Sequence, residues 1–502
     1  MNNIQSIAAA AEIAPKAKPQ PLVRLNRRFI AFTLLATLLY SWLLLVFGTP
    51  SYIQDSAAYY KGGRAAVSYA VERIRGPQDA ATNRPVTKRA GAPALPPGEA
   101  AAKDASGVRS ITYSVAAYLL SAPRASLVLL AIVQALAAGA ITVATLGAFG
   151  GLPFRRTTAG LVVLACATTV APVCFLAIPD IFAGLLIASM VLLTAAQSRL
   201  TPGVRLVCLG IATFAVTAHG SHIPIAAGMT ALGLGWVAIR RFSNEPPPRW
   251  AGSWIIAPLI VGGMIVLALN RVAFGETSLA AKRYPFALAR SVDDGPARWY
   301  LNKHCPERKY AICSVYPQGL PAGGAIEFLW GPEGVTKRAT PAELDRIRAE
   351  EPKIVLAAAR DYPGFEAKTL VIDIGRQLVF FRPYPFEKRM TVDRTGIPRL
   401  VPADSSHEQV LLIVQILTAI SAATGTVWLA WAFFEKRSLR PVIALIFLGI
   451  LGNAVTCVAL SAVAHRYEAR VVWLIPLFAL ALRGSTERRS GSADHTEARA
   501  AS

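Results

Sequence analysis

Ionisable side chains stand at the ends of the apolar segments of this 502-residue chain. In the stretch GTPSYIQDSAAYY, residues 48–60, Asp55 follows the first apolar run, and Asp180 directly precedes another. A carboxylate in such a place can act as a general base toward a hydroxyl or bind a divalent cation, which is the only cofactor that the sequence suggests. Each carboxylate also suits the start of a helix, where it would cap free backbone N–H groups. The residues alone leave both alternatives open.

Two histidines form a second polar group. His219 and His222, in HGSH, join two apolar runs, and a ligand pair at this spacing in a turn can converge on a metal or a phosphate. Without a third ligand a metal site is weakly supported. We therefore expect a role in substrate binding, with an ordinary polar turn as the alternative.

Two arginines form a third group. Arg466 and Arg470, in HRYEAR, lie four residues apart and share a helical face. Such a pair predicts a fork for a phosphate or pyrophosphate, with Tyr467 between its arms. The alternative is contact with lipid headgroups, with Glu468 as a partial partner.

The composition shows which kind of chain must position these groups. Hydrophobic residues make up 54% and charged residues 16% of the sequence, which indicates an all-α membrane protein that crosses the bilayer many times. The formal charge of +22 would suggest nucleic acid if it formed one patch. Because the basic residues lie in short segments between apolar runs, they indicate topology, and we expect no nucleic-acid partner.

Apolar stretches of bilayer length, about 20 residues each, predict about ten membrane-spanning helices, several of them short. They fall near residues 29–47, 125–148, 159–178, 181–196, 203–218, 223–239, 252–271, 410–434, 441–464 and 471–482. Every second link between these stretches is basic, and so are the two tails, 1–28 and 483–502. The short links 179–180 and 219–222, which lie between the basic ones, contain no Lys or Arg. The positive-inside rule then predicts a plasma (inner) membrane protein with both termini cytoplasmic. The first span shows no cleavage site behind it and is expected to be retained.

The same rule places two long segments outside the cytoplasm, the first loop 48–124 and the segment 272–409. The second is long enough to form a small α or α+β domain between spans seven and eight. Within it, Thr340-Pro-Ala-Glu343 predicts a capped helix through residue 359 or 360, and residues 365–381 predict a second helix on the membrane surface or the bundle. In the first loop we expect short helices at 52–75 and 111–120 and a mobile middle at 75–110.

The cysteines in this outer segment are Cys305 and Cys313. An oxidising compartment favours a disulfide between them. A metal site with His304, or two free thiols, remains the alternative.

The whole arrangement resembles the GT-C superfamily of multi-spanning glycosyltransferases, which take a sugar from a polyprenyl-phosphate or polyprenyl-diphosphate carrier on the outer face. The resemblance lies in the first span, the acidic residue within TPSYIQDSAAYY, the long second outer segment and the Arg-Tyr pair before the last span. It implies that Asp55 is the catalytic base or a metal ligand. It also implies a lipid-linked sugar donor and a glycan, lipid or protein acceptor at a membrane-embedded site. The residues that would bind the substrates are Tyr59, Lys61, Arg64, Asp180, His219, His222, Arg466, Tyr467 and Arg470.

Two other classes of function stay open. A transporter or flippase of a lipid-linked or anionic solute would place ionisable residues in mid-membrane and show internal repeats. The sequence shows no repeat, and its polar groups gather at one predicted face. A non-catalytic subunit of envelope polysaccharide assembly would use the outer segment to bind protein.

Overall fold

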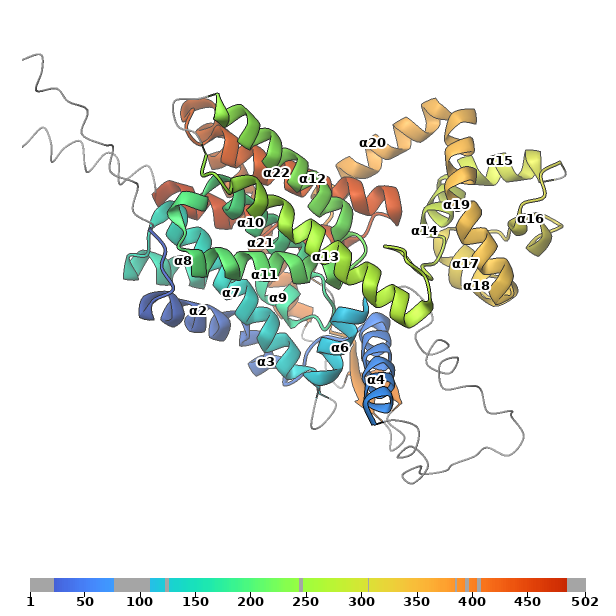
Figure 1. The fold of residues 1–502 in the computed structure, drawn as a ribbon, viewed down its shortest axis with the longest axis horizontal. Coiled ribbons are helices and arrows are strands. Elements are labelled where there is room, and N and C mark those ends of the chain that lie inside the picture. Colours follow the sequence, from blue (N-terminus) through green and yellow to red (C-terminus); the bar gives the residue numbers. More distant parts are fainter. Residues whose placement is uncertain are drawn as a thin grey trace, which may run out of the picture.

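The computed structural model describes residues 22–75, 109–121, 126–242, 247–305, 307–383, 386–392, 397–403 and 408–484. Most of the first loop's middle, predicted to be mobile, and most of both tails lie outside these residues. In the described residues, the regular secondary structure is helical except for one β-hairpin. Its helices form a large bundle and a smaller group to one end of it (Figure 1).

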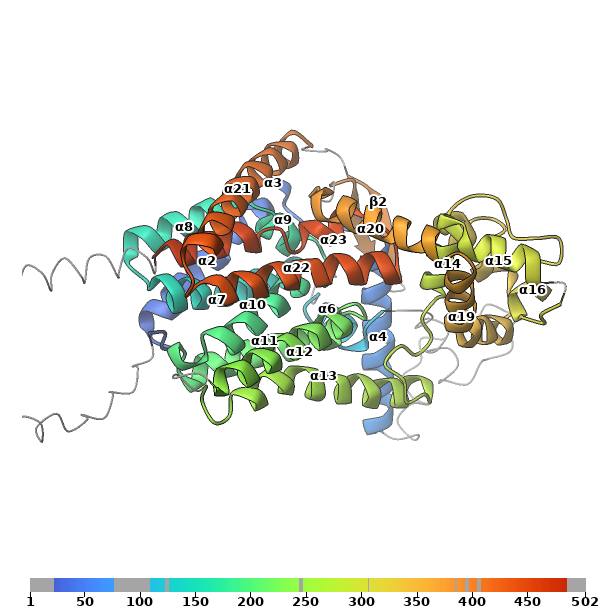
Figure 2. The ribbon, with the colours of Figure 1, turned by 90° about the horizontal axis from the view of Figure 1, so that it is seen from above.

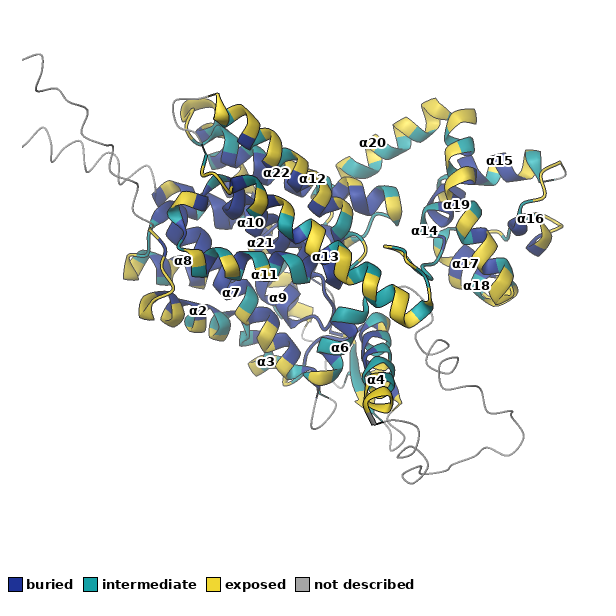
Figure 3. Cartoon of the chain, viewed as in Figure 1, coloured by how far each residue is buried: buried dark blue, intermediate teal, exposed yellow. Residues whose placement is uncertain are grey.

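Apolar helices form the bundle. They are α2 (Arg27–Tyr40), α3 (Trp42–Phe47), α7 (Val128–Gly150), α8 (Phe154–Ala167), α9 (Val170–Phe175), α10 (Ile181–Ala195), α11 (Pro202–Ala218), α12 (His222–Arg241), α13 (Ala251–Phe274), α21 (Glu408–Glu435), α22 (Arg440–Leu460) and a last helix over residues 474–484. A short 3-10 helix, η2 (Gln197–Arg199), joins α10 to α11. Helices α7 and α10 are largely buried at the centre, whereas α13 exposes much of its surface (Figure 3).

Among the described residues, six helical stretches are long and apolar enough to cross a membrane. They are α2 with α3, α7, α12, α13, α21 and α22; α10 and α11 are apolar but shorter. The exposed side chains of α13 and α21 include many large apolar residues, such as Ile260, Met264 and Ile416. Apolar surface of this extent is typical of contact with lipid. The structure therefore agrees with an all-α polytopic membrane protein, while the number of ten spans stays a prediction.

One predicted span, 159–178, is not continuous. The helix stops after α8, Thr168 is extended at φ −144° and ψ 169°, and α9 follows as a separate short helix. The Thr168 hydroxyl donates to the Leu164 carbonyl at 2.6 Å, and the Thr169 hydroxyl donates to the Ala469 carbonyl at 2.5 Å. Side-chain bonds to backbone compete with helical ones. Apolar composition predicted one continuous span here and could not predict this break.

A second hydrophobic cluster lies outside the bundle. It is formed by α14 (Phe286–Asp294), α15 (Pro296–His304), α16 (Ala311–Val315), α17 (Ala325–Trp330), α18 (Val335–Arg338) and α19 (Pro341–Asp361). The capped helix predicted from Thr340 is confirmed: the Glu343 N–H donates to the Thr340 hydroxyl, and the Glu343 carboxylate accepts from the Thr340 N–H at 2.8 Å. Cys305 and Cys313 are joined by a disulfide, with Cα atoms 5.4 Å apart.

The remaining elements connect this cluster to the bundle or lie across its end. Helix α20 (Pro363–Val379) leads back to the bundle, close to the predicted 365–381. Strands β1 (Lys388–Val392) and β2 (Pro398–Pro402) pair antiparallel, with Met390 opposite Leu400, and both of these residues pack on the bundle core. The first loop contributes α4 (Gln54–Arg75) and α6 (Ile111–Leu119), which match the two helices predicted at its ends. In both views α4 crosses the bundle end transversely (Figures 1 and 2).

Candidate functional site

The chain segment before α4 fixes the position of Asp55. Gly48 ends α3 with a positive φ of 71°, which turns the chain. Ser51 then pairs with the segment after α9: its N–H donates to the Phe175 carbonyl at 3.2 Å, and its carbonyl accepts from the Ala177 N–H at 3.0 Å. At the start of α4 the Ile53 N–H donates to the Ser56 hydroxyl at 3.1 Å. Ser56 therefore serves the helix start, and the Asp55 side chain is left for other partners.

Asp55 pairs with two arginines from distant parts of the chain. One carboxylate oxygen accepts from the guanidinium of Arg109, and the other lies 3.4 Å from Nη1 of Arg466. These three side chains are between 21% and 24% exposed, so solutes can reach them. The two arginines lie 54 and 411 residues from Asp55 in sequence. Asp55 thus belongs to an ion-paired cluster, which we name the Asp55 cluster (Asp55, Arg109 and Arg466).

Arg109 was not identified from the sequence. It directly precedes Ser110, whose hydroxyl accepts from the Tyr113 N–H at 3.1 Å and donates to the Thr217 carbonyl at 2.5 Å. Ser110 thereby starts α6 and ties it to the last turn of α11. The only signal was a basic residue just before a predicted helix, in a loop where basic residues are common.

Arg466 is carried by the short helix α23 (His465–Ala469). The Gln377 side chain at the end of α20 holds Ala464, just before this helix: it donates to the Ala464 carbonyl at 3.0 Å and accepts from its N–H at 2.9 Å. The Arg466 guanidinium also lies over the Tyr467 ring, 5.0 Å from its centroid. These contacts direct Arg466 toward α4.

Arg470 does not form the predicted fork with Arg466. It is fully buried, and its guanidinium donates to Asn453 Oδ1 of α22 at 2.8 and 3.0 Å and to the Ser221 hydroxyl at 3.3 Å. Helix α23 ends at Ala469, so Arg470 lies in the following turn. The assignment of Arg470 as a substrate ligand therefore conflicts with its burial; its contacts join α12, α22 and the last helical segment.

For Asp180, the alternative to the predicted binding role is a helix cap, and the structure does not show that cap. Asp180 occupies the N-cap position of α10, but its side chain makes no capping hydrogen bond. Its Oδ1 lies 3.6 Å from Nη1 of Arg470, and its side chain is 4% exposed. Within the described residues, the buried Oδ2 has no hydrogen-bond partner. Asp180 thus provides the countercharge to Arg470 behind the Asp55 cluster.

The two histidines lie close to this buried pair. Their ring centroids are 5.4 Å apart; His219 Nδ1 contacts the Ser221 hydroxyl at 2.8 Å, and His222 Nδ1 contacts the Ala215 carbonyl at 2.7 Å. Burial lowers the pKa of His219 well below its usual value, and His222 and the nearby arginines lower it further. His219 is therefore neutral at physiological pH and can accept or donate a hydrogen bond.

The predicted substrate residues of α4 have different surroundings. Tyr59 is buried against Tyr113, with ring centroids 4.8 Å apart, and lies 5.7 Å below the Arg109 guanidinium, so it supports Arg109. Lys61 and Arg64 lie about 120° and 180° around the helix from Asp55. Helix α4 therefore directs these two side chains away from Asp55.

A cavity of about 360 Å³ opens beside the Asp55 cluster. It is lined by Tyr52, Ile53, Gln54, Asp55, Glu387, Lys388 and Arg466. Glu387 and Lys388 come from the start of the β-hairpin and bring a second carboxylate and a further cation to its wall. No pattern in the sequence predicted that this hairpin would line the site.

The residues around Asp55 fit an anion better than a divalent cation. Two guanidinium groups contact its carboxylate, and cations prefer sites rich in oxygen ligands. In the part of the chain that the structure describes, no group of three His, Cys, Asp or Glu side chains is placed to hold a metal ion. The predicted metal role of Asp55 therefore lacks partner ligands among the described residues.

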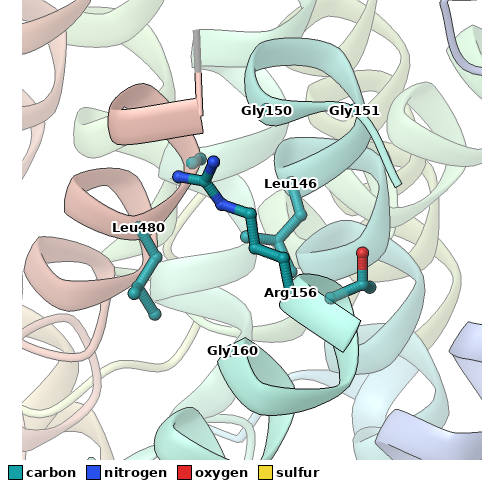
Figure 4. A pocket seen from close by; sticks show the side chains of 8 residues that line it. Leu146, Gly150, Gly151, Arg156, Gly160 and Leu480 are labelled. Carbon is teal, nitrogen blue, oxygen red and sulfur yellow. The ribbon is translucent and has the colours of Figure 1, made fainter. Parts of the chain in front are cut away.

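A second, much smaller cavity lies at the other end of α7. It has a volume of about 30 Å³ and is lined mainly by Leu146, Gly150, Arg156, Gly160 and Leu480 (Figure 4). A space of this size holds about one water molecule. It is therefore too small for a substrate.

The structure thus separates the predicted site into two layers. The accessible layer is the Asp55 cluster with its cavity, and the buried layer is the Asp180–Arg470 pair with His222, next to the half-buried His219. No family model, no curated protein and no solved structure matches this chain.

Proposed function

We propose that the protein is an integral membrane glycosyltransferase of the GT-C type, which moves a sugar from a polyprenyl-phosphate carrier to an acceptor hydroxyl. The observation that carries the proposal is the Asp55 cluster, of which Asp55 and Arg466 line a cavity of about 360 Å³ and Arg109 contacts Asp55. It combines one carboxylate suited to proton removal with two guanidinium groups suited to phosphate, at one end of a bundle of apolar helices.

The proposed reaction is a single displacement. Asp55 removes the proton of the acceptor hydroxyl, whose oxygen forms a bond to the anomeric carbon of the sugar. The bond from this carbon to the phosphate oxygen breaks, and the lipid phosphate leaves with the electron pair. A displacement of this kind inverts the anomeric configuration.

The arginines would stabilise the leaving phosphate. Without substrate, Arg109 and Arg466 both pair with Asp55. A donor phosphate in the cavity would compete for these guanidinium groups, and their transfer to the phosphate would free the carboxylate to act as a base. Lys388, which lines the same cavity, would add a further positive charge.

We further propose that this site faces the extracytoplasmic side of the plasma membrane. The basic links between spans support this orientation. The Cys305–Cys313 disulfide supports it too, because disulfides persist in oxidising compartments. The segment 272–409 and both first-loop helices would then lie outside, and the acceptor would be an envelope glycan, lipid or protein.

The most direct test compares cells with and without the gene. We expect loss of the gene to cause accumulation of a polyprenyl-phosphate sugar and loss of a sugar from an envelope glycan, with both restored by the intact gene. Unchanged lipid-linked sugars and glycans would contradict the proposal.

A transporter is the second candidate, because two observations favour it. The helix break between α8 and α9 and the buried Asp180–Arg470 pair are features that transporters use to bind and pass ions. If this function is correct, deletion should change the uptake of a solute and leave envelope glycans intact.

A further inference from the structure

One side of helix α20 packs against the bundle, and Gln377 is buried there. The other face exposes large apolar side chains: Val371 is 70%, Ile372 43% and Val379 75% exposed. A helix in water normally presents polar residues on its outer face. The exposed face of α20 therefore requires an apolar partner.

The charges on α20 indicate which partner fits. Lys368 and Arg376 lie on the exposed side, with the Arg376 side chain 70% exposed. The acidic side chains of Glu366 and Asp373 are only 16% and 15% exposed: Glu366 pairs with Arg290, and Asp373 lies 3.4 Å from Arg376, whose side chain still reaches solvent. We name the exposed surface of Val371, Ile372, Val379, Lys368 and Arg376 the α20 outer face. An apolar surface with basic residues fits an anionic lipid headgroup region.

The position of α20 brings this face to the membrane boundary. Gln377 is bonded to Ala464, four residues beyond Leu460, where the candidate span α22 ends. In both views α20 lies between the bundle and the α14–α19 group (Figures 1 and 2). The C-terminal end of α20, which includes Val379, is therefore level with the end of the candidate span α22.

We propose that the α20 outer face lies against the membrane surface and binds anionic phospholipid. Next to it, the Phe380 ring stacks on His465 at a centroid distance of 3.4 Å, and Gln377 holds Ala464. Lipid bound to α20 therefore stabilises the segment that carries Arg466. The proposal requires only that the bundle is embedded in a membrane and does not depend on glycosyl transfer.

Site-directed spin labelling of the full chain in lipid nanodiscs tests this. In a Cys166→Ser background, which removes the exposed free cysteine, Val371→Cys and Val379→Cys are labelled in separate variants. Lys353→Cys, an exposed position on α19, is the matched control. Oxygen, which concentrates in lipid, and a water-soluble nickel chelate then report the surroundings of each label.

We expect the labels at 371 and 379 to be more accessible to oxygen than to the nickel chelate, and the label at 353 to show the reverse. In nanodiscs without phosphatidylglycerol, the label at 371 should become more accessible to the chelate. Adding Lys368→Gln and Arg376→Gln should remove this lipid dependence. Labels at 371 and 379 that prefer the nickel chelate would overturn the proposal. Labels shielded from both reagents would also overturn it, because they would indicate a protein partner.

Discussion

Exposure divides the charged residues of the site into two groups. Asp55, Arg109 and Arg466 are partly exposed, whereas Asp180 and Arg470 are almost completely buried. A group that meets substrate must be reachable by it. A buried ion pair mainly fixes the elements that carry its two partners, because removal of one partner leaves an uncompensated charge.

Asp55→Asn tests the role of the carboxylate. The amide keeps the size of the side chain but cannot take a proton, so we expect transfer activity to fall by about 10²- to 10⁴-fold, the usual contribution of a general base. Yield and thermal stability should change little, because the side chain is partly exposed. Activity is measured as sugar transfer from the accumulated lipid donor. Normal turnover by this variant would show that Asp55 is not the base.

Arg466→Gln and Arg470→Gln should have different effects although the two residues lie four positions apart. Arg466→Gln should lower transfer about 100-fold through loss of phosphate binding, with the thermal midpoint nearly unchanged. Arg470→Gln leaves Asp180 buried and unpaired and should cost about 3–5 kcal/mol of stability. Thermal unfolding in detergent, beside activity, separates the two effects.

The double variant Asp180→Asn with Arg470→Gln is the control for this comparison. It removes both charges and should recover much of the lost stability. A stable Arg470→Gln protein that has lost only activity would instead make Arg470 a substrate ligand.

At the scale of elements, the packing of α4 on α6 holds the carboxylate in place. Gly63 allows this close approach: a Cβ there would lie 1.9 Å from the Ser114 carbonyl oxygen and 2.7 Å from Tyr118 Cβ. A Cβ at the neighbouring Gly62 would lie 3.3 Å from the Ser114 hydroxyl, which can move.

Gly63→Ala should therefore push α4 away from α6 and displace Asp55. We expect a cost of roughly 1–3 kcal/mol and a marked loss of activity. Gly62→Ala is the matched control and should be neutral or slightly stabilising, because alanine favours helix. Thermal stability and transfer activity of both variants are compared. Equal effects of the two substitutions would contradict this account of the interface.

Asp294, the last residue of α14, makes the stability of the folded protein depend on pH. Burial raises the pKa of Asp294 from 3.8 to about 6; Arg290 opposes this, and Asp373 and Asp293 add to it. The folded state therefore holds the proton more tightly than the unfolded state. This contribution to stability is present below about pH 4 and is lost as the pH rises through 6.

Asp294→Asn should remove this loss and stabilise α14 at pH 7 by on the order of 1–2 kcal/mol. The difference from the unmodified protein should disappear near pH 4. Hydrogen exchange of the α14 backbone amides, compared between the two proteins at each pH, measures the effect. Faster exchange in the variant at pH 7 would show that the ion pair with Arg290 outweighs the cost of burial.

For the whole molecule, the orientation in the membrane decides which substrates can reach the site. Reporter fusions after Arg156, Arg241 and Arg437 should report cytoplasm, and fusions after Gly107 and Arg338 should report the outside. The physical reason is the bias of Lys and Arg toward cytoplasmic loops. A reversed signal at any of these positions would move the Asp55 cluster to the other side of the membrane.

The sequence by itself determined the membrane class, the helices at the ends of the first loop and the capped helix after Thr340. It also predicted that Asp55, Asp180, the two histidines and the arginines would gather at one end of the molecule, and the structure brings them together there. These features follow from local patterns, since apolar length, helix caps and charged links act within a few residues.

Only the tertiary structure decided which charges meet. Arg109 and Arg466 reach Asp55 across 54 and 411 residues, and Arg470 turns into the bundle although its sequence spacing suggested a fork with Arg466. The break after α8 and the place of the β-hairpin at the cavity also depend on contacts between distant segments. Side-chain direction is set by the packing of neighbouring elements, and no local pattern contains that information.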